Sequence, residues 1–145
     1  MRRVIFCLLI ALSLPGLALA DGVKSYPFDG EFDDAAFGVE SAIVDRGLVV
    51  DYVSHVGEML KRTKDDVGGS KALFANANVY LFCSAVLSRK MMEANAENIA
   101  HCPYGIFVTE GIDGTVQIGY RQMPQGPMKE VEALLEAIVQ EAISD

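Results

Sequence analysis

Residues 80–109, YLFCSAVLSRKMMEANAENIAHCPYGIFVT, contain a helical pattern between two apolar runs. The runs Val79–Phe82 and Gly105–Thr109 are rich in β-branched and aromatic residues, which is typical of buried strands. Between them, Ser84 is a suitable N-cap for a helix. The apolar face of that helix is predicted to comprise Val86, Leu87, Met91 and Ala94. The stretch therefore predicts two strands joined by a helix.

The sequence on both sides of this stretch predicts three more strands and three more helices. Asp33 is expected to cap the first of these helices. Its apolar face is predicted to comprise Ala36, Phe37, Ile43 and Val44. An apolar stripe from Met128 to Ala142 predicts a long C-terminal helix, with a solvent face of Lys129, Glu132, Glu136 and Gln140. The remaining predicted elements are strands at 23–28, 48–53 and 115–121 and a short helix at 55–63.

The order of these elements decides the fold class. Strands come in consecutive runs and not in strict alternation with helices, which favours an α+β fold over a doubly wound sheet. Gly111 and Gly114 lie between the last two strands, and glycine is favoured in tight turns, so these strands are expected to form a hairpin. We expect a two-layer sandwich in which one sheet face packs against the C-terminal helix and the helix near Phe37.

The first twenty residues have the pattern of a secretory signal peptide. Arg2 and Arg3 precede an apolar run, and Ala18-Leu19-Ala20 supplies the small-x-small pattern of signal peptidase cleavage. The alternative is an N-terminal membrane anchor, but the apolar run is too short to span a bilayer. We therefore expect cleavage after Ala20, a single domain at 21–145, and a periplasmic or secreted location.

Export would make the chain more acidic. The sequence has 12 Lys and Arg against 20 Asp and Glu, which gives a net charge of −8. Loss of Arg2 and Arg3 leaves 10 basic residues (12 − 2), so the exported chain carries about −10 (10 − 20). A charge of this sign argues against nucleic acid and anionic membranes as partners.

The sequence contains no familiar catalytic signature, because G-x-S-x-G, H-E-x-x-H and C-x-x-C are all missing. Its two histidines are His55 and His101. His101 adjoins Cys102, but neighbouring side chains on a strand point to opposite faces, which disfavours a thiol–imidazole pair. The sequence therefore favours a protein that is not an enzyme and that needs no cofactor.

Cys83 and Cys102 allow three interpretations. The first is a disulfide or redox pair, since exported proteins lie in oxidising compartments. This requires antiparallel strands, because parallel strands would place the two cysteines at opposite ends of the sheet. The second is a soft-metal site, binding copper or haem, made of Cys83, His101, Cys102 and Met91. The third is a pair of inert, buried thiols.

Four polar or aromatic side chains on or beside apolar strands are candidates for lining a pocket. They are Tyr52, His55, Tyr104 and Arg121. An outward-facing sheet edge explains the three strand residues equally well, and a lone histidine at position 55 is more often a surface residue than a ligand.

Three segments in this order resemble the domain of unknown function 302 family: Phe82-Cys83-Ser84-Ala85, Met91-Met92-Glu93-Ala94 and Cys102–Val108. The resemblance covers about Val23 to Glu141. Many members of that family have a proline followed by cysteine where this chain has Pro103-Tyr104, and here the cysteine comes one place earlier. The resemblance implies a fold similar to TATA-binding-protein-like domains, with a curved, mainly antiparallel sheet packed on a long C-terminal helix. It also implies a homodimer, and it implies no activity.

Two functions of different classes follow from these observations. The first is an exported, non-catalytic module, expected to be a homodimer, that binds a small ligand or a partner protein in a periplasmic pathway. The second is a thiol redox or soft-metal accessory protein that uses Cys83, His101 and Cys102, with copper or haem as the bound group. Neither nucleic acid nor a membrane is an expected partner of the cleaved chain.

Overall fold

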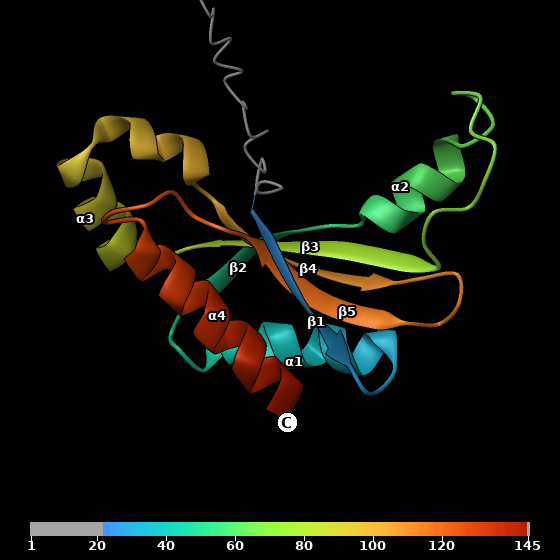
Figure 1. The fold of residues 1–145 in the computed structure, drawn as a ribbon, viewed down its shortest axis with the longest axis horizontal. Helices are drawn as coiled ribbons and strands as arrows, with labels where there is room; N and C mark the ends of the chain where they lie inside the picture. The colour runs from blue at the N-terminus through green and yellow to red at the C-terminus, as the bar shows by residue number, and fades with distance from the viewer. Residues whose placement is uncertain (1–21, 145) are drawn as a thin grey trace, which may run out of the picture.

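A computed structural model describes residues 22–144, so the predicted signal peptide lies outside the described residues. Five strands form one antiparallel sheet (Figure 1). The strands are β1 (Val23–Phe28), β2 (Val49–Ser54), β3 (Asn76–Cys83), β4 (Tyr104–Glu110) and β5 (Val116–Arg121). The helices are α1 (Phe32–Val44), α2 (Val56–Thr63), α3 (Ala85–Ala94), the 3₁₀ helix η1 (Ala96–His101) and α4 (Lys129–Ser144).

The spatial order of the strands is β1-β5-β4-β3-β2. Strands β2 to β5 follow one another as a meander, and β1 pairs with β5 at the opposite edge from β2. The connection from β1 to β2 therefore crosses the whole sheet, and α1 makes this crossing beneath it (Figure 1). Phe82 lies opposite Tyr104 at the end of the β3–β4 pair, where β4 begins.

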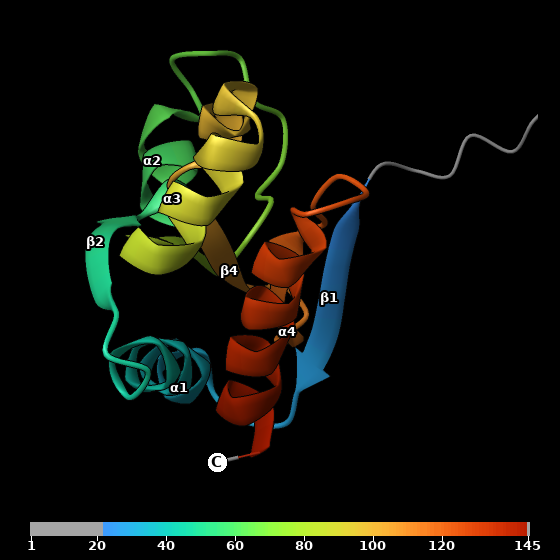
Figure 2. The same cartoon turned by 90° about the vertical axis from the view of Figure 1, so that its left-hand side faces the viewer.

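Helices α1 and α4 cover one face of the sheet and form the second layer. Figure 2 shows α4 running alongside β1, with α1 on its other side. Phe82, Ile106 and Ile118 point from the sheet into this layer and are fully buried. The buried residues of α4 lie on the side that faces the sheet: Val131, Leu135, Ile138, Val139 and Ala142. The prediction of an α+β sandwich with a long C-terminal helix on an antiparallel sheet is confirmed.

The face of α1 that enters the core differs from the predicted one. Phe37 is 73 % exposed and Val44 is 54 % exposed, while the buried positions are Ala35, Gly38, Val39, Ala42 and Ile43. Small residues allow a close approach to α4, and a Cβ on Gly38 would lie 3.1 Å from the Ala142 carbonyl oxygen. The helix begins at Phe32 with Glu31 in the N-cap position, so the prediction that Asp33 caps it is wrong.

Helix α3 begins as predicted, because the Ser84 hydroxyl accepts a hydrogen bond of 3.3 Å from the Leu87 backbone N–H. Met91 is buried, as its place on the predicted apolar face requires, but Val86 is 79 % exposed. The chain then continues into η1, where the Asn95 side chain accepts a hydrogen bond from the Glu97 N–H. This turn returns the chain to the end of the sheet at which β3 ends and β4 begins.

Glu136 does not lie on the solvent face of α4, where the helical pattern placed it. Its carboxylate accepts hydrogen bonds from Lys24 Nζ at 2.7 Å, from Tyr26 OH at 2.5 Å and from Tyr120 OH. Gln140 Nε2 adds a fourth bond at 3.0 Å. These bonds join the edge strand β1 to α4, so Glu136 stabilises the packing of β1 against the helix.

The second face of the sheet is covered only at its ends. Helix α2 packs on β3, where a Cβ on Gly57 would lie 2.6 Å from the Ala77 backbone nitrogen. Helices α3 and η1 stand at the other end, so the middle of this face lies between them without a helix of its own (Figure 1). Within residues 22–144, no helix has the length and apolar character needed to cross a bilayer.

Candidate functional site

The uncovered middle of the sheet contains a cavity of about 320 Å³, which we name the sheet-face pocket. Its floor is made by Val79 and Leu81 of β3 and by Gly105 and Phe107 of β4. These residues alternate with the core residues of the same strands, as the period of two in a strand requires. Gly105 lies opposite Leu81 in the register and contributes no side chain. The hollow therefore exists because a glycine stands where another residue would fill the face.

Two polar side chains from distant elements lie at this pocket. His101, the last residue of η1, lies on one side, and Arg121, the last residue of β5, lies on another. The pairing of β4 with β5 brings Arg121 to the same end of the sheet as the start of β4. The site thus combines an apolar floor with an imidazole and a guanidinium, which together can hold an apolar ligand that carries a negative charge.

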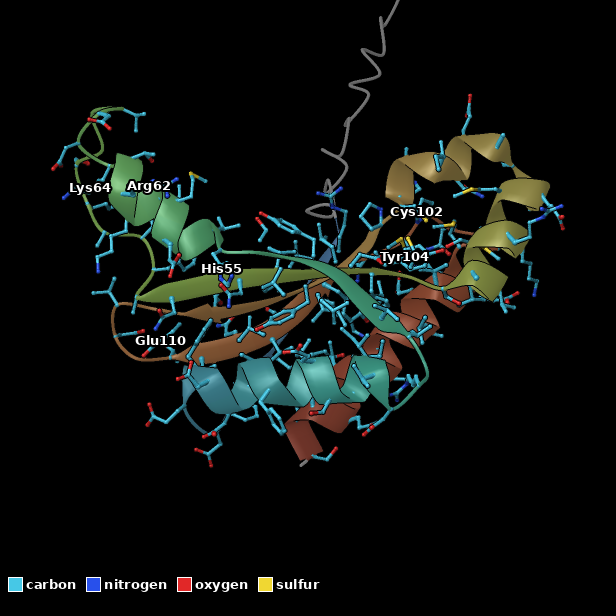
Figure 3. The ribbon with its side chains drawn as sticks, turned by 180° about the vertical axis from the view of Figure 1, so that it is seen from behind. His55, Arg62, Lys64, Cys102, Tyr104 and Glu110 are labelled. Atoms are coloured by element: carbon cyan, nitrogen blue, oxygen red, sulfur yellow. The ribbon has the colours of Figure 1, made fainter. Side chains whose placement is uncertain are left out.

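Beside the pocket lies a group of side chains that we name the thiol end: Cys83, Ser88, Cys102 and Tyr104. Because β3 and β4 are antiparallel, the end of β3 and the start of β4 meet, so Cys83 and Cys102 lie at the same end of the sheet. The Cys102 sulfur is 3.4 Å from Ser88 Oγ, which is 3.1 Å from Tyr104 OH. Figure 3 shows Cys102 and Tyr104 close together beside α3.

The pKa values of Cys83 and Tyr104 are raised, mainly because the surrounding protein shields these groups from water. Partial burial of the Cys83 sulfur raises the pKa of that thiol, and the neighbouring Cys102 raises it further through charge and hydrogen bonding. Burial is also the main reason why the pKa of Tyr104 rises to about 12. Both cysteines are free thiols in the structure. The raised pKa favours the protonated form of the Cys83 thiol.

The proposed soft-metal set is not brought together as a whole. Among residues 22–144, no three His, Cys, Asp or Glu side chains are grouped so that they could hold a metal ion. His101 lines the sheet-face pocket, whereas Cys102 contacts Ser88, and Met91 is buried in the core. The two thiols lie together without the histidine, and copper or haem stays a prediction from the sequence.

The four predicted pocket residues are placed in four different environments. Arg121 lines the sheet-face pocket. Tyr104 is buried in the core, and Tyr52 is 62 % exposed on β2. His55 lies at the start of α2, where its Nδ1 is 2.9 Å from Asn78 Oδ1. Of the four, Arg121 is the one placed at the sheet-face pocket.

Sequence reasoning missed the floor of the pocket. Val79, Leu81 and Phe107 were assigned to buried strands, and which of their faces stays open depends on where α1 and α4 pack. The available signal is the pair of glycines on neighbouring strands: Phe107 lies opposite Gly119 and Leu81 lies opposite Gly105. Glycine inside a strand often marks a close approach of another group to the backbone.

Comparisons with known proteins agree with this fold. One solved structure, of an uncharacterized conserved DUF302 protein from Bacillus stearothermophilus, superimposes with a TM-score of 0.61 and 15 % sequence identity. The alignment covers 84 % of this chain and 95 % of that one, and at this identity it shows the fold alone. No curated protein matches the chain. The family model described as domain of unknown function DUF302 matches residues 24–144, so the chain belongs to the DUF302 family.

Proposed function

We propose that the protein is an exported, non-catalytic module that binds a small apolar ligand with an acid group in the sheet-face pocket. The observation that carries this proposal is the pocket itself, a hollow of about 320 Å³ on the one sheet face that no helix covers along its middle. Small-molecule sites in proteins have volumes of about 300–1,000 Å³, with apolar walls and few polar groups. The sheet-face pocket fits the lower end of that range.

The charge of Arg121 supports an acidic ligand. Arg121 makes no ion pair with any other residue in the described part of the chain, although acidic residues outnumber basic ones two to one after Ala20. A guanidinium can hold a carboxylate through two parallel hydrogen bonds. His101 supplies a further donor nearby. The flat apolar body of such a ligand would pack on Val79, Leu81 and Phe107. Its acid group would then face the Arg121 guanidinium.

A suitable probe is 2-naphthoate, with its neutral analogue 2-naphthamide, both titrated calorimetrically. We expect Arg121→Gln to weaken 2-naphthoate binding about tenfold, which corresponds to the loss of one charge-assisted hydrogen bond of about 1.5 kcal/mol. The neutral analogue should bind both proteins equally, because it has no negative charge for Arg121 to neutralise. Arg89→Gln is the matched control, since Arg89 is exposed on α3 and pairs with Glu93.

Equal binding of 2-naphthoate to the native protein and to Arg121→Gln would contradict the assignment of the acid group to this arginine. Loss of the neutral analogue together with the acid would show that Arg121→Gln disturbs the pocket rather than its charge. Absence of binding of either compound to the native protein would contradict the proposal that the pocket accepts a small apolar acid.

A second candidate function is thiol redox chemistry, and the observation that favours it is the adjacency of Cys83 and Cys102. In this reaction both S–H bonds are lost and one S–S bond forms. The two protons and two electrons pass to a disulfide oxidant such as oxidised glutathione, which becomes two glutathione thiols. Because the pKa of Cys83 is raised, attack by its thiolate becomes faster as the pH rises above the usual thiol range.

Titration with oxidised glutathione tests this candidate on the chain from Asp21 onward, which contains two cysteines. We expect both thiols to disappear together and the intact mass to fall by two hydrogens. In Cys83→Ser the remaining Cys102 can form only a mixed disulfide with glutathione, which mass spectrometry distinguishes. Persistence of both thiols at alkaline pH, or mixed disulfides on both cysteines of the native chain, would contradict an intramolecular pair.

Export and dimerisation remain predictions that accompany this proposal. The signal-peptide pattern precedes the described residues, and purification of the protein from periplasm with Asp21 as its first residue would establish export. The homodimer rests on the family resemblance. Strand β2 is an edge strand with Val49 and Tyr52 exposed, which offers an unpaired edge to a second copy.

A further inference from the structure

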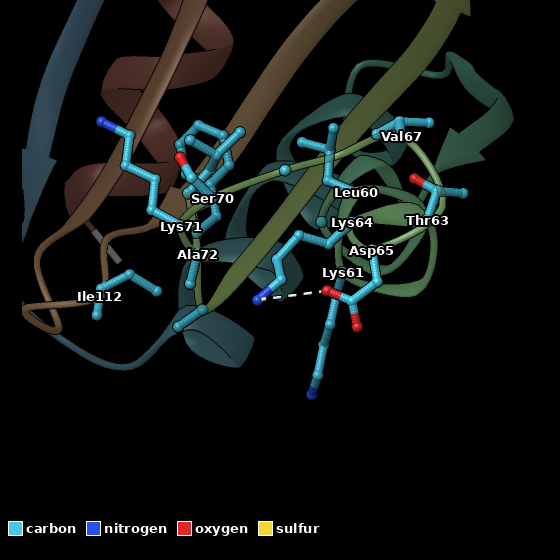
Figure 4. A pocket seen from close by; sticks show the side chains of 15 residues that line it. Leu60, Lys61, Thr63, Lys64, Asp65, Val67, Ser70, Lys71, Ala72 and Ile112 are labelled. Atoms are coloured by element: carbon cyan, nitrogen blue, oxygen red, sulfur yellow. Dashed lines mark ion pairs between the residues drawn. The ribbon is translucent and has the colours of Figure 1, made fainter.

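A second and larger cavity lies at the other end of the molecule. It has a volume of about 640 Å³ and is enclosed by the C-terminal half of α2, by residues 64–75 and by Ile112 in the β4–β5 turn (Figure 4). It shares no lining residue with the sheet-face pocket. We name it the α2 pocket, and its volume lies well inside the range of small-molecule sites.

The walls of the α2 pocket are largely apolar and only half covered. Leu60 lines it from α2, and Leu73 and Phe74 line it from the segment that leads into β3. Leu73 is 50 % exposed, and Ile112 across the cavity is 61 % exposed. Exposed apolar side chains that face one another around a hollow are typical of a binding surface rather than of ordinary surface residues.

Most of the basic residues that lack an ion-pair partner among residues 22–144 lie at the same place. Residues 22–144 contain 10 Lys and Arg, six of which form ion pairs within this range. The four without an ion-pair partner among the described residues are Lys61, Arg62, Lys71 and Arg121. Arg121 belongs to the sheet-face pocket, and the other three lie on α2 and the segment after it. Lys61 and Lys71 both line the α2 pocket.

Lys64 adds a third lysine to the lining. Its Nζ lies 3.8 Å from Asp65 Oδ1, and the Asp65 side chain is 92 % exposed. An ion pair that is this exposed contributes little to stability. Three lysines against one aspartate make the lining positive in a domain whose overall charge is about −10. In Figure 4 the Lys71 side chain extends from one side of the cavity and the Lys61 side chain from the other, with Lys64 between them. Positive charge at the rim and apolar surface inside complement a molecule with an acid head and a hydrocarbon tail.

We propose that the α2 pocket binds a single-chain amphipathic anion of the fatty-acid type. The acid head lies at the rim, which Lys61, Lys64 and Lys71 make positive, and the tail packs against Leu60, Leu73 and Phe74. A discrete ligand fits better than a membrane surface, because the apolar side chains enclose a hollow and the strongly acidic domain is repelled by anionic lipid. This site is separate from the sheet-face pocket and does not depend on it.

The test uses 11-(dansylamino)undecanoate, a fluorescent fatty acid, and its neutral methyl ester. We expect the Lys61→Gln/Lys71→Gln double variant to bind the acid about tenfold more weakly and the ester as well as the native protein does. Both lysines are exposed, so the double variant should keep the native melting temperature. Leu73→Asp should weaken the acid and the ester alike, because it places a negative charge against the tail.

Three outcomes would overturn the proposal. The first is equal binding of the acid to the native protein and to the lysine double variant. The second is a loss of acid binding in Arg121→Gln, which would place the fatty acid in the sheet-face pocket. The third is lysine-dependent binding to phosphatidylglycerol vesicles without binding of the monomeric probe, which would make this region a membrane-docking surface. The sheet-face proposal is tested with a different probe, so failure of one leaves the other standing.

Discussion

Gly119→Ala is expected to destabilise the protein by about 3 kcal/mol, at the upper end of the usual cost of overpacking. Gly119 lies in β5 between Ser25 of β1 and Phe107 of β4. An added Cβ would contact the Phe107 ring and would lie 2.5 Å from the Lys24 carbonyl oxygen. The ring can rotate, but the carbonyl oxygen belongs to the backbone of a paired strand, so β1 must shift away from β5. Urea unfolding should show a lower midpoint concentration, while the dependence of the unfolding free energy on urea concentration stays unchanged.

Gly105→Ala is the matched control for this substitution. Gly105 lies on the same face of the neighbouring strand, and its added Cβ would meet Leu81 Cδ2 at 3.3 Å and Val79 Cγ1 at 3.5 Å. Both contacts are side-chain tips that can move, so we expect a change within about 1 kcal/mol. If both alanine variants are equally stable, the close packing of Gly119 between β1 and Phe107 is incorrect.

Glu136→Gln is expected to destabilise the protein by about 2 kcal/mol, which lowers the melting temperature by roughly 8 °C in a domain of this size. Its carboxylate accepts hydrogen bonds from Lys24, Tyr26 and Tyr120 in a partly buried cluster. An uncharged amide cannot accept all of these bonds, and it leaves the Lys24 ammonium without its counter-ion. Glu130→Gln on the same helix is the control, since Glu130 pairs with Lys90 at an exposed site and should change little.

The same cluster gives stability a defined dependence on pH. Burial of the Glu136 carboxylate acts to raise its pKa, but the hydrogen bonds from Lys24, Tyr120 and Tyr26 outweigh burial and lower it to about 2. A carboxylate whose pKa is lower in the folded state stabilises the fold above its unfolded pKa. That stability is lost as the pH falls from about 4.5 toward 2.

The difference between native protein and Glu136→Gln isolates this contribution from other acids. Glu132 also has a lowered pKa, because Lys129 and the Met123 N–H outweigh its burial, and it is present in both proteins. The destabilisation caused by Glu136→Gln should therefore be largest near neutral pH and should shrink below about pH 4. A difference in unfolding free energy that stays constant from pH 7 to pH 3 would show that Glu136 is not the titrating group.

Periodicity in the sequence is sufficient to predict most of the secondary structure. The runs around Val79–Phe82 and Gly105–Thr109 are strands, Ser84 caps α3, and the stripe ending at Ala142 forms α4. The reason is that each of these elements has one apolar face with a regular period, and burial of that face fixes its position. The family resemblance correctly predicted an antiparallel sheet. Periodicity alone does not determine the relative direction of the strands.

The errors occur where packing partners are distant in the sequence. Large residues such as Phe37 were expected inside, but α1 packs against α4 through Gly38 and neighbouring small residues. The helical pattern predicts a solvent position for Glu136. Its partners are instead Lys24 and Tyr26 on β1, more than one hundred residues away, and Tyr120 on β5. A pattern within one element cannot report such partners.

The candidate sites could be predicted only in part for the same reason. The adjacency of Cys83 and Cys102 depended on strand direction, and the antiparallel pair of β3 and β4 places them at one end. The sheet-face pocket depends on which face α1 and α4 leave open and on the alignment of Gly105 with Leu81. Arg121 could be identified as a polar residue on an apolar strand, but its position across from His101 depends on where η1 lies.

The most direct test of the sheet-face pocket is a nuclear magnetic resonance titration of ¹⁵N-labelled protein with 2-naphthoate. We expect the largest backbone shift changes at His101, Gly105, Phe107 and Arg121. At a ligand concentration near the native dissociation constant, we expect those at His101, Gly105 and Phe107 to be several-fold smaller in Arg121→Gln. Shift changes confined to α2, residues 64–75 and Ile112, or no saturable changes at all, would contradict the proposed site.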